Sequence, residues 1–130
     1  MPGFLAGITV GLIIMQTMVL APTLFRTLEM GPAGTLLRAL FPKFFLLLAA
    51  LGLITLLTSF GARNGSIAQA ILAAITIALP LTCWALIPAT NRATDRGDTA
   101  RFKKLHLLSV LLTVVVLLAN IAIPLVGATE

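Results

Sequence analysis

The chain has 130 residues, of which 59% are hydrophobic and only 10% are charged, and its mean hydropathy is +1.11. About 25% of the residues of a soluble domain are charged, and they cover its surface, so this composition excludes a surface that faces water. Such an apolar surface is compatible with the acyl chains of a bilayer, so membrane lipid is the first expected partner. The net charge of +5 does not indicate a nucleic-acid partner, because the basic residues flank apolar runs.

Four uncharged runs organise residues 1–130 as a single transmembrane domain. They lie at about residues 5–24, 44–60, 67–90 and 105–126. At 1.5 Å per residue, each run can cross about 30 Å of hydrocarbon as an α-helix. The runs are continuously apolar, without the period-two alternation of a transmembrane β-barrel. The sequence therefore predicts an all-α fold, an integral membrane four-helix bundle whose first run is a retained helix.

The connection between the first two runs contains a short amphipathic segment. After Gly31-Pro32, residues 33–41 place Leu36, Leu37, Leu40 and Phe41 on one side and Arg38 on another. This pattern predicts a short interfacial helix that lies in the headgroup layer. Farther along, we expect Ser66 to cap the third helix, and Asp98 or Thr99 to cap the fourth.

The distribution of basic residues predicts an orientation in the cell membrane. The first and third connections hold eight Lys and Arg residues, which are Arg26, Arg38, Lys43, Arg92, Arg96, Arg101, Lys103 and Lys104. The second connection holds Arg63 alone. By the positive-inside rule, both basic connections face the cytoplasm and both termini are extracytoplasmic.

Small residues recur at every fourth position in two of the runs. They are Gly3, Gly7 and Gly11 in the first run, and Ser66, Ala70, Ala74 and Ala78 in the third. Such stripes allow helices in lipid to approach closely. They fit packing inside the bundle, or contact between copies of the chain, and a homo-oligomer is expected. Pro80 is expected to kink the third helix.

Polar residues are costly in hydrocarbon, so their positions in the apolar runs are informative. In the first run they are Thr9, Gln16 and Thr23, and in the last run His106, Ser109, Thr113 and Asn120. A spacing of seven residues places side chains on nearly one helix face, so we expect the two stripes to face each other inside the bundle. They would supply hydrogen bonds between helices, or a polar site for a ligand.

His106 suits a proton relay or a metal site, because its ordinary pKa lies near neutrality. A hydrogen bond to a neighbouring loop is the simpler interpretation. Met15, Met18 and Cys83 add ligand types that suit a soft metal such as Cu(I), but their spacing matches no known cluster. The cofactor is therefore left open. No catalytic motif is present, and we do not expect an enzyme.

The third connection suggests other roles. Asn91, Asp95 and Asp98 alternate with arginines, a pattern that favours a solvated, salt-bridged segment over a cation site. Its basic residues could attract anionic lipid or a partner protein, as in a membrane scaffold or assembly factor. A haem- or quinone-binding subunit is a further alternative, although one histidine cannot ligate a haem from both faces.

Several short motifs in chain order resemble the transmembrane-protein-205-like family. They are Phe25-Arg26, Leu40-Phe41-Pro42 with Phe44-Phe45, Pro88 with Asn91-Arg92 and Asp95, and Phe102 with Leu105-His106 and Ser109. The resemblance implies a small four-helix membrane domain of unassigned function and, from an association of eukaryotic relatives with platinum-drug tolerance, handling of a soft metal. Phe45 stands where the family pattern has a tyrosine, and Thr113 where it has an asparagine. Both departures remove hydrogen-bonding capacity from the polar core.

The leading hypothesis is a membrane protein that binds or transports a small solute or soft metal. Its site would be the polar stripe inside the bundle, made of Gln16, His106, Ser109, Thr113 and Asn120. The residues Arg26, Asn91, Arg92 and Asp95 would belong to the cytoplasmic connections.

Overall fold

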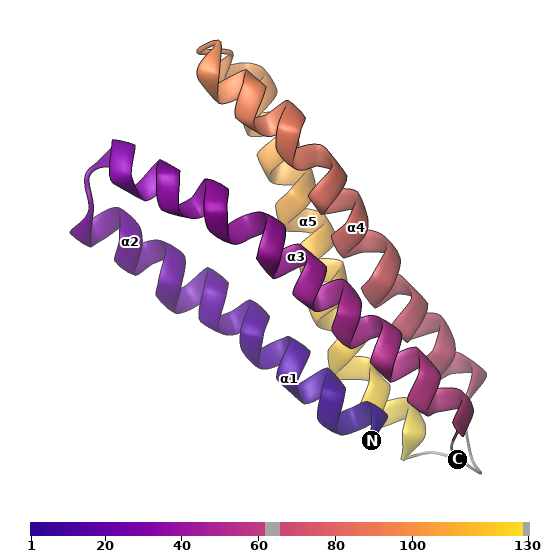
Figure 1. Ribbon diagram of the computed structural model, residues 1–130. Helices are drawn as coiled ribbons and strands as arrows, with labels where there is room; N and C mark the ends of the chain where they lie inside the picture. Colours follow the sequence, from indigo (N-terminus) through magenta and orange to yellow (C-terminus); the bar gives the residue numbers. More distant parts are fainter. Residues whose placement is uncertain (62–65, 129–130) are drawn as a thin grey trace.

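The structure is a computed structural model that describes residues 1–61 and 66–128, and within them it forms a bundle of long helices (Figure 1). The first span consists of α1 (Pro2–Ile14), the π-helical segment η1 (Met15–Leu20) and α2 (Ala21–Thr27). The other spans are α3 (Met30–Gly61), α4 (Ile67–Asp95) and α5 (Thr99–Gly127).

All four spans are long and apolar enough to cross a bilayer. Large hydrophobic side chains cover much of the outer surface of the described residues, among them Phe4, Leu57 and Leu118, which are each more than half exposed. A surface of this kind is stable against acyl chains and not against water. The chain is therefore a multi-pass membrane protein with an all-α bundle fold.

The expected interfacial helix is wrong. Residues 33–41 are the first part of α3, which continues through Pro42 to Gly61. Proline keeps a helical φ and removes only one backbone hydrogen bond, so Pro42 does not end the helix. With 32 residues, α3 is about 48 Å long at 1.5 Å per residue, well beyond the hydrocarbon thickness. The interfacial segment and the span are thus one rod.

The first span contains one wide turn. In η1 the backbone N–H of Ala21 donates to the carbonyl of Gln16, five residues back. Pro22, which follows, has no N–H to donate to the preceding turn. The π-helical turn adds about one residue to the α-helical repeat, which rotates the residues after it by roughly 100° relative to those before it.

Helix ends follow the sequence signals. Asp98 is the N-cap of α5, and its side chain accepts a hydrogen bond from the Arg101 N–H at 3.1 Å. Ser66 occupies the N-cap position of α4, but its side chain makes no capping hydrogen bond, so the expected cap is confirmed in position alone. Between α4 and α5, Gly97 has a φ of 69°, a left-handed conformation that glycine adopts without a Cβ penalty. The α4–α5 connection is consequently a tight turn of three residues, Arg96–Asp98.

The core lies where α4 packs against both α3 and α5, and α1 packs against α5 and α3. Ile13, Leu48, Cys83 and Val116 belong to its buried cluster. The closest approach occurs at Gly52, where an added Cβ would lie 2.8 Å from the Thr76 carbonyl carbon. Gly52 therefore permits the contact between α3 and α4.

The small-residue stripes do not form this core. Gly7 and Gly11 are exposed, and nothing lies within 4 Å of a Cβ added at either. Ala74 and Ala78 are exposed as well. The buried face of α4 is another line of residues, which includes Gln69, Ala73, Thr76, Pro80 and Cys83. The expected bundle packing through the stripes is thus wrong for Gly7, Gly11, Ala74 and Ala78, and these residues face outward.

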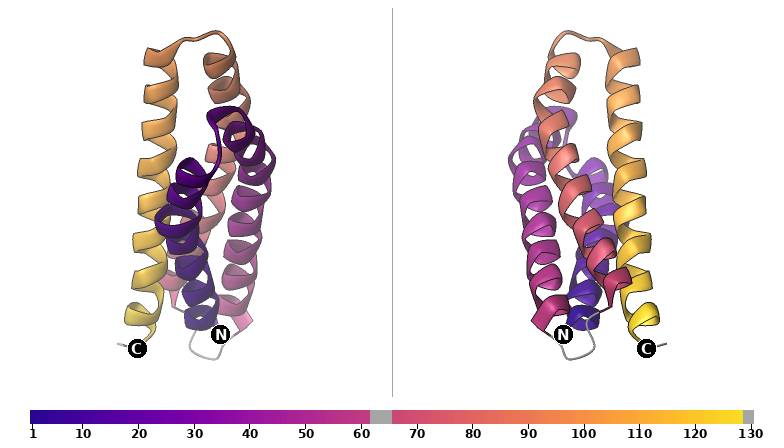
Figure 2. Two further views of the ribbon diagram at one scale, coloured as in Figure 1. Left: turned by 90° about the vertical axis from the view of Figure 1, so that its left-hand side faces the viewer. Right: turned by 90° about the vertical axis from the view of Figure 1, so that its right-hand side faces the viewer.

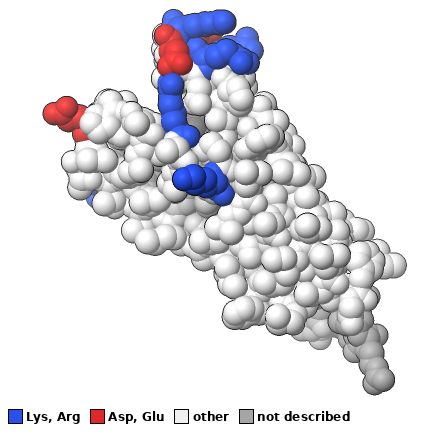
Figure 3. All heavy atoms as spheres, viewed as in Figure 1, with Lys and Arg blue, Asp and Glu red and all other residues white. Residues whose placement is uncertain are grey.

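The two turns α2–α3 and α4–α5 lie at one end of the bundle, whereas α1 begins and α5 ends at the other (Figure 2). Towards the turns, the first span and α3 diverge from the α4–α5 pair (Figure 1). Lys and Arg side chains gather over this divergent half (Figure 3). The bundle is therefore closed at the end of the chain termini and splayed at the basic end.

Candidate ligand cavity

The splayed half of the bundle holds a cavity of about 760 Å³. Residues of all four spans line it, from Ile13 to Phe25 in the first span and from Thr99 to Leu117 in α5. This volume lies within the range of about 300–1,000 Å³ that is common for small-molecule sites. The cavity exists because the first span packs on α5 through α1, while η1 and α2 bend away with α3.

Gln16 is the key polar residue of the cavity. It lies in η1, one turn from Ile13, and its side chain is only 5% exposed. No other described residue forms a hydrogen bond with its side-chain amide. Burying a polar group without a hydrogen bond costs about 1–3 kcal/mol, so a molecule in the cavity that bonds to this amide would be stabilising.

Three residues of the other stripe line the same cavity from α5. They are His106, Ser109 and Thr113. The Thr113 hydroxyl donates to the Ser109 carbonyl at 2.8 Å, which leaves its oxygen able to accept. The His106 ring stacks on Phe102, with centroids 5.6 Å apart and planes 10° apart. The structure thus brings together four of the five residues of the expected intrabundle site.

Aromatic rings of α3 form another wall. Phe41 stacks on Phe45 with ring centroids 5.8 Å apart, and Phe44 lies 5.4 Å from Phe45 in a tilted arrangement. All three line the cavity, and Phe44 and Phe45 are buried. The wall is apolar because Phe45 carries no hydroxyl. The aromatic surface of α3 therefore faces the same cavity as Gln16 of the first span and Thr113 of α5.

The fifth residue of the expected site lies elsewhere. Asn120 is buried between α4 and α5, where its Nδ2 donates to Thr76 Oγ1 and to the Val116 carbonyl, both at 2.8 Å. In the first span, Thr9 is buried and bonded to the Leu5 carbonyl, whereas Thr23 is exposed. The π-helical turn between Gln16 and Thr23 rotates Thr23 off the face, so the expected seven-residue stripe ends at Gln16.

The basic end carries a link that sequence reasoning missed. Arg38 Nη2 lies 2.6 Å from Asp95 Oδ1, and this ion pair joins α3 to the end of α4. Arg38 and Asn91 line the cavity here, whereas Arg26 and Arg92 are exposed. Asp95 was expected to pair with arginines of its own segment. The longer α3 brings Arg38 within reach instead, because residues 33–41 extend the span.

The metal-ligand types do not converge. Among the described residues, no group of three or more His, Cys, Asp and Glu side chains is placed to hold a metal ion. Met15 and Met18 are more than half exposed on the outside of the bundle. Cys83 is buried in the core, where its thiol donates to the Ser109 carbonyl at 3.7 Å. His106 therefore has no soft-metal partner within the described residues.

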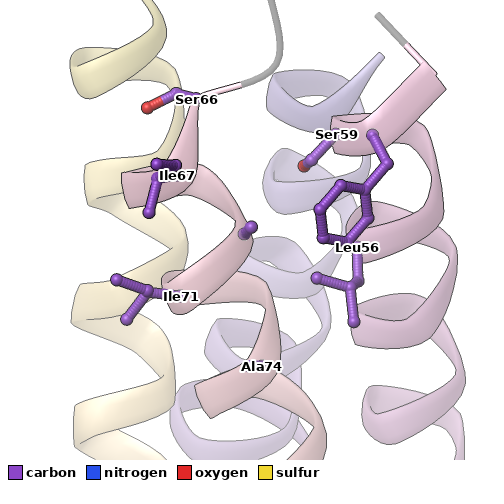
Figure 4. A pocket seen from close by; sticks show the side chains of 8 residues that line it. Leu56, Ser59, Ser66, Ile67, Ile71 and Ala74 are labelled. Carbon is purple, nitrogen blue, oxygen red and sulfur yellow. The ribbon is translucent and has the colours of Figure 1, made fainter.

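A second, smaller recess of about 350 Å³ lies between α3 and α4 at the other end of the bundle (Figure 4). Leu56, Ile67, Ile71 and Ala74 give it a mainly apolar lining. The hydroxyl of Ser59 in this recess donates to the Thr55 carbonyl. Among its described lining residues, none is a buried amide like that of Gln16.

Comparison with known proteins places the chain in a family. A family model described as a domain of unknown function, DUF4149, matches residues 4–99. This chain belongs to the DUF4149 family. No curated protein and no solved structure matches it. In this DUF4149 protein the match spans the first span, α3 and α4, which supply Gln16 and the aromatic wall, while His106, Ser109 and Thr113 follow the matched residues.

Proposed function

We propose that this DUF4149 protein binds a small molecule within the membrane, in the cavity between its first span and α5, and carries it in the bilayer or across it. One observation supports the proposal above all. Gln16 is nine-tenths buried, forms no hydrogen bond through its side chain with another described residue, and lines a cavity large enough for a small molecule. A buried amide in that state is stabilised when a ligand supplies the missing hydrogen bonds.

The test is to fill the cavity without disturbing the bundle. Gly34 lines the cavity and has open space around an added Cβ, so Gly34→Leu places a side chain in it. Gly31 lies one turn earlier in α3, also in open space and outside the lining, so Gly31→Leu is the matched control. Both changes replace a helical glycine and should favour the helix.

The readout is native mass spectrometry of protein released from nanodiscs. Wild type and Gly31→Leu should retain a non-lipid adduct of constant mass, whereas Gly34→Leu and Gln16→Leu should lose most of it. Equal retention by all four proteins would remove the cavity from the proposal, and so would an absence of adduct in every one.

For the orientation, we propose that the basic end faces the cytoplasm of a cell membrane and that both termini are extracytoplasmic. The clustering of Lys and Arg over the turn end supports this, because cytoplasmic connections are enriched in these residues. A phosphatase reporter fused after Glu130 should be active only outside the cytoplasm. Cytoplasmic activity of the fusion would invert the orientation. The outward-facing Gly7 and Gly11 support the proposed homo-oligomer, which cross-linking in native membranes would test.

A second candidate function is that of a scaffold that binds anionic lipid or a partner protein at the basic end. Exposed cations around the α4–α5 turn favour it, namely Arg92, Arg96, Arg101, Lys103 and Lys104. Each attracts an anionic surface by about 1 kcal/mol. Reversing Arg101, Lys103 and Lys104 to Glu should then abolish a cellular phenotype that Gln16→Leu leaves intact. The reverse pattern would favour the cavity.

A soft metal is a third candidate ligand, suggested by the resemblance to the transmembrane-protein-205-like family. The scattered positions of Met15, Met18 and Cys83 give it no support in the described structure. Retention of a neutral organic adduct by the wild-type protein would argue against a metal, whereas a Cu(I) adduct lost in His106→Ala would argue for one.

A further inference from the structure

We infer that the ligand is a neutral, membrane-soluble amphiphile with a hydrogen-bonding ring, such as a quinone-like compound, and that it enters from the bilayer between the first span and α5. This inference rests on the proposed function, because it names the class of molecule that the cavity takes. It follows from the charge, the shape and the opening of the lining.

The lining favours a neutral molecule. Within the described residues, the charged groups that line the cavity are Arg38 and Asp98. Arg38 is paired with Asp95, and Asp98 caps α5, so both charges are already engaged at the turn end. The deeper groups are the amide of Gln16 and the Thr113 hydroxyl. A charged ligand held at that depth would lack a counter-charge in a medium where an unpaired charge is very costly.

Two pairs of stacked rings favour a flat group. Phe41 and Phe45 stack on α3, and Phe102 and His106 stack on α5, and all four line the cavity. Aromatic faces and edges attract a further ring in offset or edge-to-face geometry. The Gln16 amide has both a donor and an acceptor, so a carbonyl or hydroxyl on such a ring satisfies it.

The exposed edge of the cavity favours entry from lipid. Phe25 of the first span and Val110 and Val114 of α5 line the cavity and are also 53%, 42% and 43% exposed. These side chains form an apolar rim on the outer surface of the bundle, where the spans meet lipid. At the turn end, by contrast, Arg38 and Asn91 are polar. A ligand dissolved in acyl chains therefore meets an apolar path into the cavity.

The experiment measures binding of tritiated decylubiquinone to the protein in nanodiscs, corrected for protein-free nanodiscs. Decylbenzene, which has no hydrogen-bonding group, and decyltrimethylammonium, which is charged, serve as unlabelled competitors. We expect saturable binding of the quinone, weak competition by both comparators, and about tenfold weaker binding in Gln16→Leu, the effect of one desolvated hydrogen bond. Thr82→Val is the control, because the Thr82 hydroxyl is exposed on α4, bonded to the Ala78 carbonyl and outside the lining.

Entry from lipid has its own pair of variants. Val114→Trp narrows the rim and should slow association at least severalfold, whereas Leu118→Trp, one turn away, 59% exposed and outside the lining, should not. Equal association rates in the two variants would overturn the lateral route.

The outcomes separate the inference from the proposed function. Strong displacement of the tritiated quinone by decylbenzene or by decyltrimethylammonium would overturn the inference of a neutral ligand with a hydrogen-bonding ring. Quinone binding that Gln16→Leu leaves unchanged would overturn it as well. If decylubiquinone fails to bind while the native adduct is retained by wild type and lost in Gly34→Leu, the inference falls and the proposed function stands. If the native adduct is absent as well, both fall.

Discussion

Gly52 offers the sharpest test of the packing between α3 and α4. A Cβ at this position would lie 2.8 Å from the carbonyl carbon of Thr76 and 3.0 Å from the nitrogen of Ile77. Both are backbone atoms, so no side-chain rotation relieves the contact, and the helices must separate by several tenths of an ångström. Overpacking of this kind costs about 1–3 kcal/mol. Replacing a helical glycine returns about 0.5–1 kcal/mol. Gly52→Ala should therefore lower the free energy of unfolding by up to about 2.5 kcal/mol, and by about 1–3 kcal/mol relative to a glycine-to-alanine change without the clash.

The assay is reversible unfolding in mixed micelles, followed by circular dichroism as the denaturing detergent fraction rises. Gly11→Ala is the matched control, since nothing lies within 4 Å of its added Cβ. It keeps the gain in helix propensity without the clash, and monomeric protein should be unchanged or slightly more stable. If Gly52→Ala proves as stable as Gly11→Ala, the close approach of α3 to α4 is incorrect.

Three other expectations follow from the described contacts. Asn120→Leu should change the unfolding free energy by no more than about 1 kcal/mol, because it removes the bond to Thr76 together with an Oδ1 that has no partner among the described residues. Asn120→Ala should cost more, because it also opens a cavity. A larger loss of stability in the leucine variant than in the alanine variant would contradict this expectation. Cys83 should resist N-ethylmaleimide in native membranes and react after denaturation, as mass spectrometry would show; rapid native labelling would place the thiol at the surface. Asp95→Arg should cause only a small loss of thermal stability, which shrinks with added salt, because the ion pair with Arg38 is exposed. Adding Arg38→Asp should restore stability, because it recreates the pair with the charges exchanged. If the double variant is not restored, the link between α3 and α4 is incorrect.

The helical content was predictable because hydrophobic length alone determines it. Every expected span lies inside an observed helix, and Asp98 caps α5 as its sequence position indicates. The expected ends were less accurate, since apolar runs mark where lipid begins and not where helical hydrogen bonding stops. Pro42 illustrates the point. The predicted interfacial helix stops just before it, yet α3 runs through Pro42 because a proline inside a helix costs one bond and leaves φ helical.

The cavity was predictable only in part. The seven-residue spacing predicted that Gln16 faces the polar residues of the last span, and the structure places Gln16, His106, Ser109 and Thr113 around one cavity. The spacing gave no information on which helices face each other. The bond from Asn120 of α5 to Thr76 of α4 could therefore not be predicted. Gly52 was not predicted because a single close approach leaves no sequence repeat, whereas Gly7 and Gly11, which do belong to a repeat, face outward.

The wide turn at Met15–Leu20 affects how related chains should be compared. Because that turn absorbs one additional residue, a relative with an uninterrupted α-helix there would need one residue fewer to keep both flanking halves on their present faces. An alignment gap inside this segment would then be structurally silent, whereas the same gap elsewhere in the span would swing α2 around its axis. Pairing of residues beyond Leu20 between such chains therefore depends on whether both carry the wide turn.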